Sequence, residues 1–117
     1  RSVALIHCGS KILLRRIPKG SLMADLHEFP YLDTKEEGIP TGKLVKWVHT
    51  KLHLRVAVGK TFPEVRQGFT RYRVYLRPFM MSTQNKKLVD SYIWVNVSEL
   101  RSLPFSSGHK KIVNYLN

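Results

Sequence analysis

Two short apolar runs open the chain. Residues 3–7 and 12–16 are rich in Val, Ile and Leu, and they are joined at the turn-compatible link Cys8-Gly9-Ser10. A short Gly-containing link between two such runs predicts a β-hairpin. The next apolar piece, residues 29–31, contains Pro30, which has no N–H to donate, so we expect this piece at a sheet edge or a strand end.

Helical spacing of apolar residues occurs twice. The first set predicts an amphipathic helix over residues 43–52, in which Trp47 is expected to face the core; the set comprises Leu44, Trp47, Val48 and Leu52. The second predicts a last helix that starts at Ser107, and its shared face comprises His109, Ile112, Val113 and Leu116.

Strict alternation marks a strand over residues 69–77. One face is expected to carry Thr70, Tyr72, Val74 and Leu76. The opposite face is expected to carry Phe69, Arg71, Arg73, Tyr75 and Arg77. A further strand is predicted over residues 89–95, after the loop around residues 85–87.

Strands, one central helix, more strands and a terminal helix are typical of an α+β fold with a mixed sheet packed by helices. The chain has 117 residues, 43% of them hydrophobic, which suits one compact domain over residues 1–117. It opens at Arg1 and contains no signal sequence or long apolar stretch, so we expect a cytoplasmic fragment of a larger protein.

Positive charge is large and unevenly placed. The formal net charge is +12. Residues 38–88 contain a single acid, Glu64, and eleven basic residues: Lys43, Lys46, Lys51, Arg55, Lys60, Arg66, Arg71, Arg73, Arg77, Lys86 and Lys87. Five of the other acids fall between Asp25 and Glu37. A solvated basic surface would give the same count, but the clustering favours nucleic acid as the partner.

Candidate metal and nucleophile residues are few. Cys8 is the only cysteine, which excludes an internal disulfide and a cysteine-based zinc or iron-sulfur site. It lies in the predicted hairpin turn without an adjacent base, so we do not expect a thiol nucleophile. His49 and His53 have the i, i+4 spacing of two ligands on one helix face, but no third ligand stands out.

Several short motifs occur in a set order along the chain. The early ones are Leu13-Leu14-Arg15-Arg16-Ile17-Pro18, Gly20, Leu22, Leu26 and Glu28-Phe29-Pro30. The middle one is Gly68-Phe69-Thr70-Arg71-Tyr72. The late ones are Trp94-Val95, Glu99-Leu100, Leu103-Pro104-Phe105 and His109-Lys110-Lys111-Ile112. In this order they resemble the C-terminal domain of MutY-type adenine DNA glycosylases over nearly the whole chain. His27 and Arg71 depart from it, standing where that family often has Trp or Tyr and a His.

The resemblance implies a Nudix-like fold and a role in base excision repair on chromosomal DNA. A separate helix-hairpin-helix domain of such an enzyme removes adenine paired with 8-oxoguanine, and it would hold the catalytic Asp and the iron-sulfur cluster. This chain would sense 8-oxoguanine in double-stranded DNA, as a monomer without a cofactor of its own and beside its own N-terminal catalytic domain. Carried over by position, the sensing residues are Phe69, Thr70 and Arg71, and those that bind the DNA backbone are Arg66, Tyr72 and Arg73.

Two other functions remain open. A Nudix nucleotide pyrophosphohydrolase needs clustered carboxylates on a helix to hold magnesium. Residues 43–54 contain no carboxylate, and the adjacent Glu36 and Glu37 are expected to be loop charges, so we expect no catalytic residue in this chain. A nonspecific nucleic-acid or protein-interaction module would bind any polyanion, with strong salt dependence and no preference for a lesion.

Overall fold

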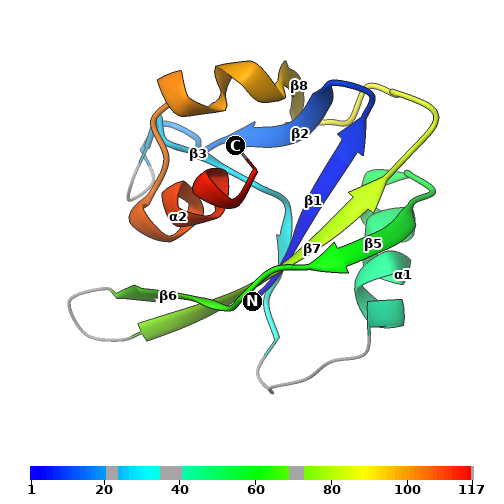
Figure 1. Ribbon diagram of the computed structural model, residues 1–117. Coiled ribbons are helices and arrows are strands. Elements are labelled where there is room, and N and C mark those ends of the chain that lie inside the picture. Colours follow the sequence, from blue (N-terminus) through cyan, green and yellow to red (C-terminus); the bar gives the residue numbers. More distant parts are fainter. Residues whose placement is uncertain (21–23, 35–40, 69–72, 117) are drawn as a thin grey trace.

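The computed structural model describes residues 1–20, 24–34, 41–68 and 73–116 (Figure 1). Its elements, in chain order, are β1 (Ser2–Cys8), β2 (Lys11–Arg16), β3 (His27–Glu28), β4 (Tyr31–Leu32), α1 (Thr41–Leu52), β5 (Ala57–Thr61), β6 (Val65–Gly68), β7 (Arg73–Ser82), β8 (Ile93–Asn96), the 3-10 helix η1 (Val97–Ser102) and α2 (Ser107–Tyr115).

The strands of the described residues form one mixed sheet. Its main path runs β3-β2-β1-β7-β5, while β4 pairs with β1, β6 with β7 and β8 with β2. The central pair β1 and β7 is parallel, and the other pairs are antiparallel. The predicted α+β class with a mixed sheet is therefore confirmed.

The predicted hairpin of β1 and β2 is confirmed. His7 lies opposite Ile12, and Cys8 opposite Lys11. Gly9 has φ +60°, a left-handed conformation that glycine adopts without strain. Cys8 is the last residue of β1 and not part of the turn, because it pairs with Lys11 across the strands.

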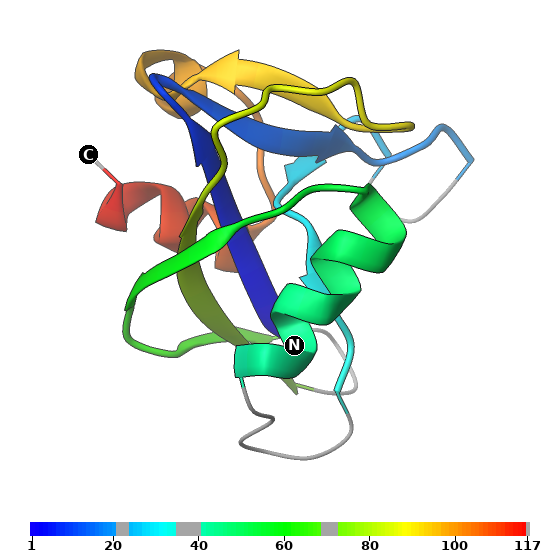
Figure 2. The same cartoon turned by 90° about the vertical axis from the view of Figure 1, so that its right-hand side faces the viewer.

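The sheet is buried on both faces, which makes three layers. On one face Val3 and Leu5 of β1 pack with residues of η1 and α2. On the other face Ala4 and Ile6 pack with α1 (Figure 2). Because successive strand residues point to opposite faces, an unbroken apolar run such as β1 is what a central strand requires.

Both predicted helices are confirmed. Helix α1 starts two residues before the predicted start and ends at Leu52, with Leu44, Val48 and Leu52 buried. Trp47 packs against this core while staying partly exposed. Helix α2 starts at Ser107, as predicted. No helix of the described residues is long and apolar enough to cross a membrane.

The predicted strand over residues 89–95 is wrong in its first half. β8 begins only at Ile93, because the chain turns before it. The N–H of Tyr92 donates to the carbonyl of Val89 at 3.0 Å, and Ser91 has φ +69°. Of the strand predicted over residues 69–77, the described part is the start of β7, and residues 69–72 lie outside the described residues.

Candidate nucleic-acid interface

Strands β6 and β7 form a hairpin that reaches out from the sheet (Figure 1). Gly68 lies opposite Arg73 and Arg66 opposite Tyr75. Residues directly opposite each other in an antiparallel pair share a face. The structure therefore brings two predicted site residues, Arg66 and Arg73, together on one exposed face of the hairpin.

The other four predicted site residues belong to the connection between these strands. Phe69, Thr70, Arg71 and Tyr72 lie outside the described residues. Tyr75, predicted on the same strand face as the arginines but not among the predicted site residues, lies opposite Arg66 and is 46% exposed. The period-two pattern was the signal that could have selected it.

The opposite face of the hairpin is fixed to helix α2 by Gln67, which is 3% exposed. Its Oε1 accepts hydrogen bonds from the N–H of Gly108 at 2.8 Å and from Oγ of Ser106 at 3.1 Å. Free N–H groups at a helix start need such acceptors. Gln67 thus holds β6 against the first turn of α2, directly before the connection that carries the predicted sensing residues.

Ion pairs explain where the uncompensated charge lies. Three acids of the acidic stretch pair with arginines outside residues 38–88, namely Asp25 with Arg16, Glu28 with Arg15 and Asp33 with Arg1. Within residues 38–88, Glu64 pairs with Arg77, Nε to Oε2, at 2.8 Å.

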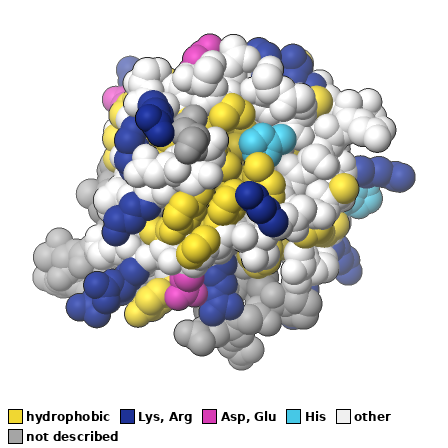
Figure 3. Space-filling view, viewed as in Figure 1, with side chains coloured by type: hydrophobic (Ala, Val, Ile, Leu, Met, Phe, Trp, Pro, Cys, Tyr) yellow, Lys and Arg dark blue, Asp and Glu magenta, His cyan; other side chains and the backbone are white. Residues whose placement is uncertain are grey.

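Within the described part of the chain, Arg66 and Arg73 have no ion-pair partner. Figure 3 shows Lys and Arg side chains on the part of the surface over the hairpin. The hairpin therefore presents cations that are free to contact an anionic partner.

The motifs that carried the resemblance converge in the core. Phe29 is fully buried and stacks on Phe105 and His109, with ring centroids 5.6 and 5.8 Å apart. The N–H of Phe29 donates to Nδ1 of His109 at 3.1 Å. The N–H of His27 donates to the carbonyl of Pro104 at 2.7 Å. These early and late motifs are therefore structural, and they join the start of the chain to α2.

Burial makes His109 a neutral residue. Burial, helped by the charges of Arg1 and Arg15, lowers the pKa of its imidazole to about 3. Its Nε2 is buried without a hydrogen-bond partner among the described residues. A ring that stays neutral in this way supports the core and does not act as a base near pH 7.

The predicted histidine pair does not share a helix face. Helix α1 ends at Leu52, and His53 follows it with φ +58°. No group of three or more metal-ligating side chains occurs in residues 1–20, 24–34, 41–68 and 73–116. The i, i+4 interpretation fails because the helix ends before its second member.

Helix α1 contains no Asp or Glu over its full length. Glu36 and Glu37 lie outside the described residues. Glu28 is buried against the guanidinium of Arg15, so its carboxylate is already paired. The helix therefore offers no oxygen ligands for a hard cation such as magnesium.

Comparison with known proteins gives a family match and a set of structural neighbours. A family model described as a NUDIX domain matches residues 2–115. The DNA mismatch repair protein MutT of methicillin-resistant Staphylococcus aureus 252, a Nudix hydrolase, has a TM-score of 0.75 at 19% identity, covering 98% of this chain and 92% of its own. The Nudix hydrolase RenU of M. smegmatis has a TM-score of 0.74 at 16% identity, covering 98% and 81%.

The C-terminal domain of mouse MUTYH, solved in a complex with human PCNA, has a TM-score of 0.66 at 17% identity, covering 98% of this chain and 83% of its own. At such identities these structures show a shared fold. No curated protein matches the chain.

Proposed function

Since the chain belongs to the NUDIX domain family, we propose that it reads damaged DNA, as the lesion-recognition domain of a MutY-type adenine DNA glycosylase. The observation that carries this proposal is the exposed hairpin face on which Arg66 and Arg73 flank residues 69–72. The major groove of duplex DNA admits a two-stranded β-ribbon, and arginines beside it contact phosphates.

In this proposal residues 69–72 meet the damaged base. 8-Oxoguanine differs from guanine by a protonated N7 and an added O8, and a hydroxyl that donates or accepts suits this difference. Thr70 supplies the hydroxyl, Phe69 an apolar contact and Arg71 a positive charge near O8 or a phosphate. The sugar-phosphate backbone of the DNA is bound by Arg66, Tyr72 and Arg73.

The proposal includes the partner domain. A separate N-terminal domain removes the adenine opposite 8-oxoguanine and holds the iron-sulfur cluster, while this chain acts as a monomer with no cofactor. The structural similarity of this chain to the C-terminal domain of mouse MUTYH supports this assignment. Tethering to the catalytic domain raises the effective concentration of the reader at the lesion.

Nudix hydrolase activity, the class named for two of the structural neighbours, is not favoured for this chain. A helix without carboxylates cannot supply the ligands that hold magnesium on a pyrophosphate. We expect no release of pyrophosphate from an oxidised nucleotide at high protein concentration with magnesium. Turnover under these conditions would replace the proposed function by hydrolysis.

Replacing Thr70 with alanine tests the lesion reading. We expect the wild-type chain to bind a duplex with 8-oxoguanine opposite adenine more tightly than the same duplex with guanine. Loss of one hydrogen bond of about 1 kcal/mol lowers this preference roughly fivefold. Fluorescence anisotropy with the two duplexes at one salt concentration measures the ratio of the dissociation constants.

The matched control is Thr50→Ala. Thr50 is exposed on α1, and its hydroxyl lies 2.9 Å from the carbonyl oxygen of Lys46 and 3.4 Å from that of Trp47, both in the same helix. This variant should keep the wild-type ratio. Equal binding of the two duplexes by the wild-type chain would instead indicate a nonspecific nucleic-acid module, with affinity that falls steeply as salt rises.

A further inference from the structure

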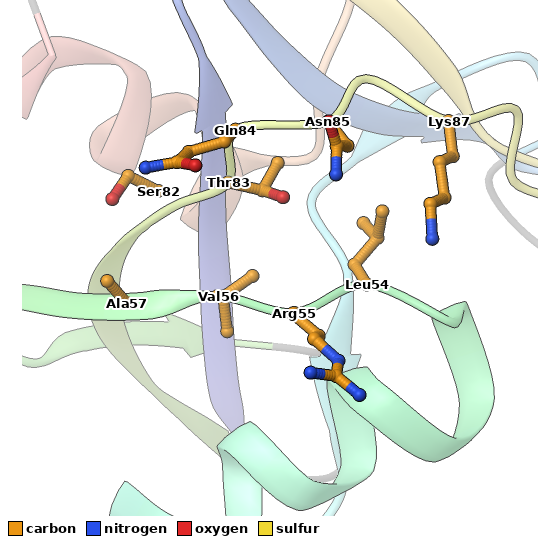
Figure 4. A pocket seen from close by; sticks show the side chains of 9 residues that line it. All are labelled: Leu54, Arg55, Val56, Ala57, Ser82, Thr83, Gln84, Asn85 and Lys87. Carbon is orange, nitrogen blue, oxygen red and sulfur yellow. The ribbon is translucent and has the colours of Figure 1, made fainter.

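Two adjoining cavities, together called the groove, lie along the link that follows α1: one lies between this link and the end of β7 (Figure 4), and the other lies beside α1. Their volumes are about 360 and 420 Å³, and they share Leu54, Arg55 and Val56. Lys46 and His49 of α1 line one cavity, and the segment from Ser82 to Lys87 contributes to the lining of the other.

The lining of this groove is positively charged. It contains Lys46, Arg55 and Lys87, and it contains no Asp or Glu. None of the three cations forms an ion pair in the described part of the chain, whereas the ion pairs found there involve Arg1, Arg15, Arg16 and Arg77. The groove is therefore suited to an anionic ligand.

The walls of the groove are held in place before any ligand binds. The N–H of Thr83 donates to the carbonyl of His7 at 2.8 Å, and Nε1 of Trp94 donates to the carbonyl of Lys87 at 2.8 Å. Leu54, 1% exposed, anchors the link in the core. Figure 4 shows the Lys87 side chain directed from the loop toward this link. Fixed walls lower the entropy cost of binding.

We propose that this groove is a second DNA-binding site, which holds the phosphate backbone of the duplex whose damaged base the hairpin reads. This inference rests on the proposed function. The hairpin connection joins β7 at its first residue, Arg73, and the last residue of β7, Ser82, lines the groove. Ten strand residues span about 30 Å, close to one turn of B-DNA. The groove therefore contacts backbone about one helical turn from the lesion.

The double variant Arg55→Ala with Lys87→Ala tests the groove. Each phosphate contact contributes about 0.9 to the slope of the logarithm of the binding constant against the logarithm of salt concentration. We expect this slope to fall by about two and the affinity to fall roughly tenfold near physiological salt, equally for the 8-oxoguanine and guanine duplexes. The measurement is anisotropy over a salt series.

The control variant is Arg101→Ala with Lys111→Ala, which removes two exposed charges from η1 and α2, the elements packed on the other face of the sheet. It should leave the salt slope of the binding constant within about half a unit of wild type, since this variant removes two positive charges but no contact to a phosphate. A slope change in the groove variant no larger than in this control would overturn the proposal.

Duplex length supplies a second measurement. With a duplex that ends about five base pairs from the lesion on both sides, the groove variant and the wild type should bind equally, because the backbone no longer reaches the groove. Equal weakening on short and long duplexes would contradict the spacing. Binding of inorganic pyrophosphate in the groove, with unchanged duplex affinity in the variant, would assign the site to small phosphates and overturn the inference.

The two proposals fail separately. If Thr70→Ala lowers the lesion preference while the groove variant keeps the wild-type salt slope, the lesion reading stands and the groove inference falls. If the groove variant lowers the slope while both duplexes bind equally, the phosphate site stands without lesion reading.

Discussion

Replacing Gly108 with alanine is expected to lower the free energy of unfolding by about 2–3 kcal/mol. In a helix this change usually stabilises by up to about 1 kcal/mol, because alanine loses less backbone entropy. Here the new Cβ would collide with Oε1 of Gln67 and would lie 2.8 Å from both Cβ of Gln67 and Cδ1 of Leu76. Gln67 would have to move, and two buried hydrogen bonds would be lost.

Gly42→Ala is the matched control, since a Cβ added there meets no atom of the described residues within 4 Å beyond its chain neighbours and its own helix. This residue lies in the first turn of α1, so the substitution should leave stability unchanged or raise it slightly. Urea denaturation of the two variants gives the free energies. A stable Gly108→Ala protein would mean that Gln67 does not fix β6 to α2 as described. Gly108→Ala should also weaken the preference for the 8-oxoguanine duplex over the guanine duplex, because Gln67, which it displaces, precedes the connection at residues 69–72.

Acid is expected to destabilise the protein through His109, by about 2 kcal/mol between pH 7.5 and pH 5. The pKa of this imidazole is about 3 in the folded chain, against 6.5 for an unperturbed histidine, which represents the unfolded chain. Between these values the unfolded chain takes up a proton that the folded chain does not, so stability falls as pH falls below about 6.5. Burial also lowers the pKa of His7, which adds to the effect in the same direction.

His109→Asn separates this contribution. The amide oxygen can still accept the hydrogen bond from the N–H of Phe29, but the side chain does not titrate. We expect lower stability at pH 7.5 because of lost ring packing, and a much flatter dependence on pH. His53→Asn is the control: His53 is exposed, and Asn tolerates its positive φ. An unchanged pH dependence in His109→Asn would contradict a neutral buried imidazole.

The elements that the sequence predicted are those with a clear periodic pattern. Burial of one or two faces requires apolar residues at the spacing of a helix or a strand, and this spacing can be recognised in the sequence. It was recognised for the β1–β2 hairpin, α1, α2 and the start of β7. β5 was missed because all five of its residues are exposed, from Ala57 to Thr61, so they carry no alternation. β6 was missed because its buried polar residue, Gln67, interrupts the apolar pattern.

The sequence predicted the candidate site only in part. The clustering of basic residues and the order of the motifs pointed to Arg66 and Arg73, and the strand register brings them to one face. The groove could not be predicted, because Lys46, Arg55 and Lys87 come from a helix, a link and a loop that only the packing of α1 beside β5 and β7 brings together.

The sequence by itself determined the fold class, the helices, the excess of positive charge and the lack of carboxylates on α1, because composition and period are local properties of the chain. Only the tertiary structure decided which cations keep their charge uncompensated. Arg1, Arg15 and Arg16 meet the acids of residues 25–33, and Arg66, Arg73 and Arg55 do not. Ion pairing depends on distance in space, and residues far apart in the chain set that distance when the sheet forms.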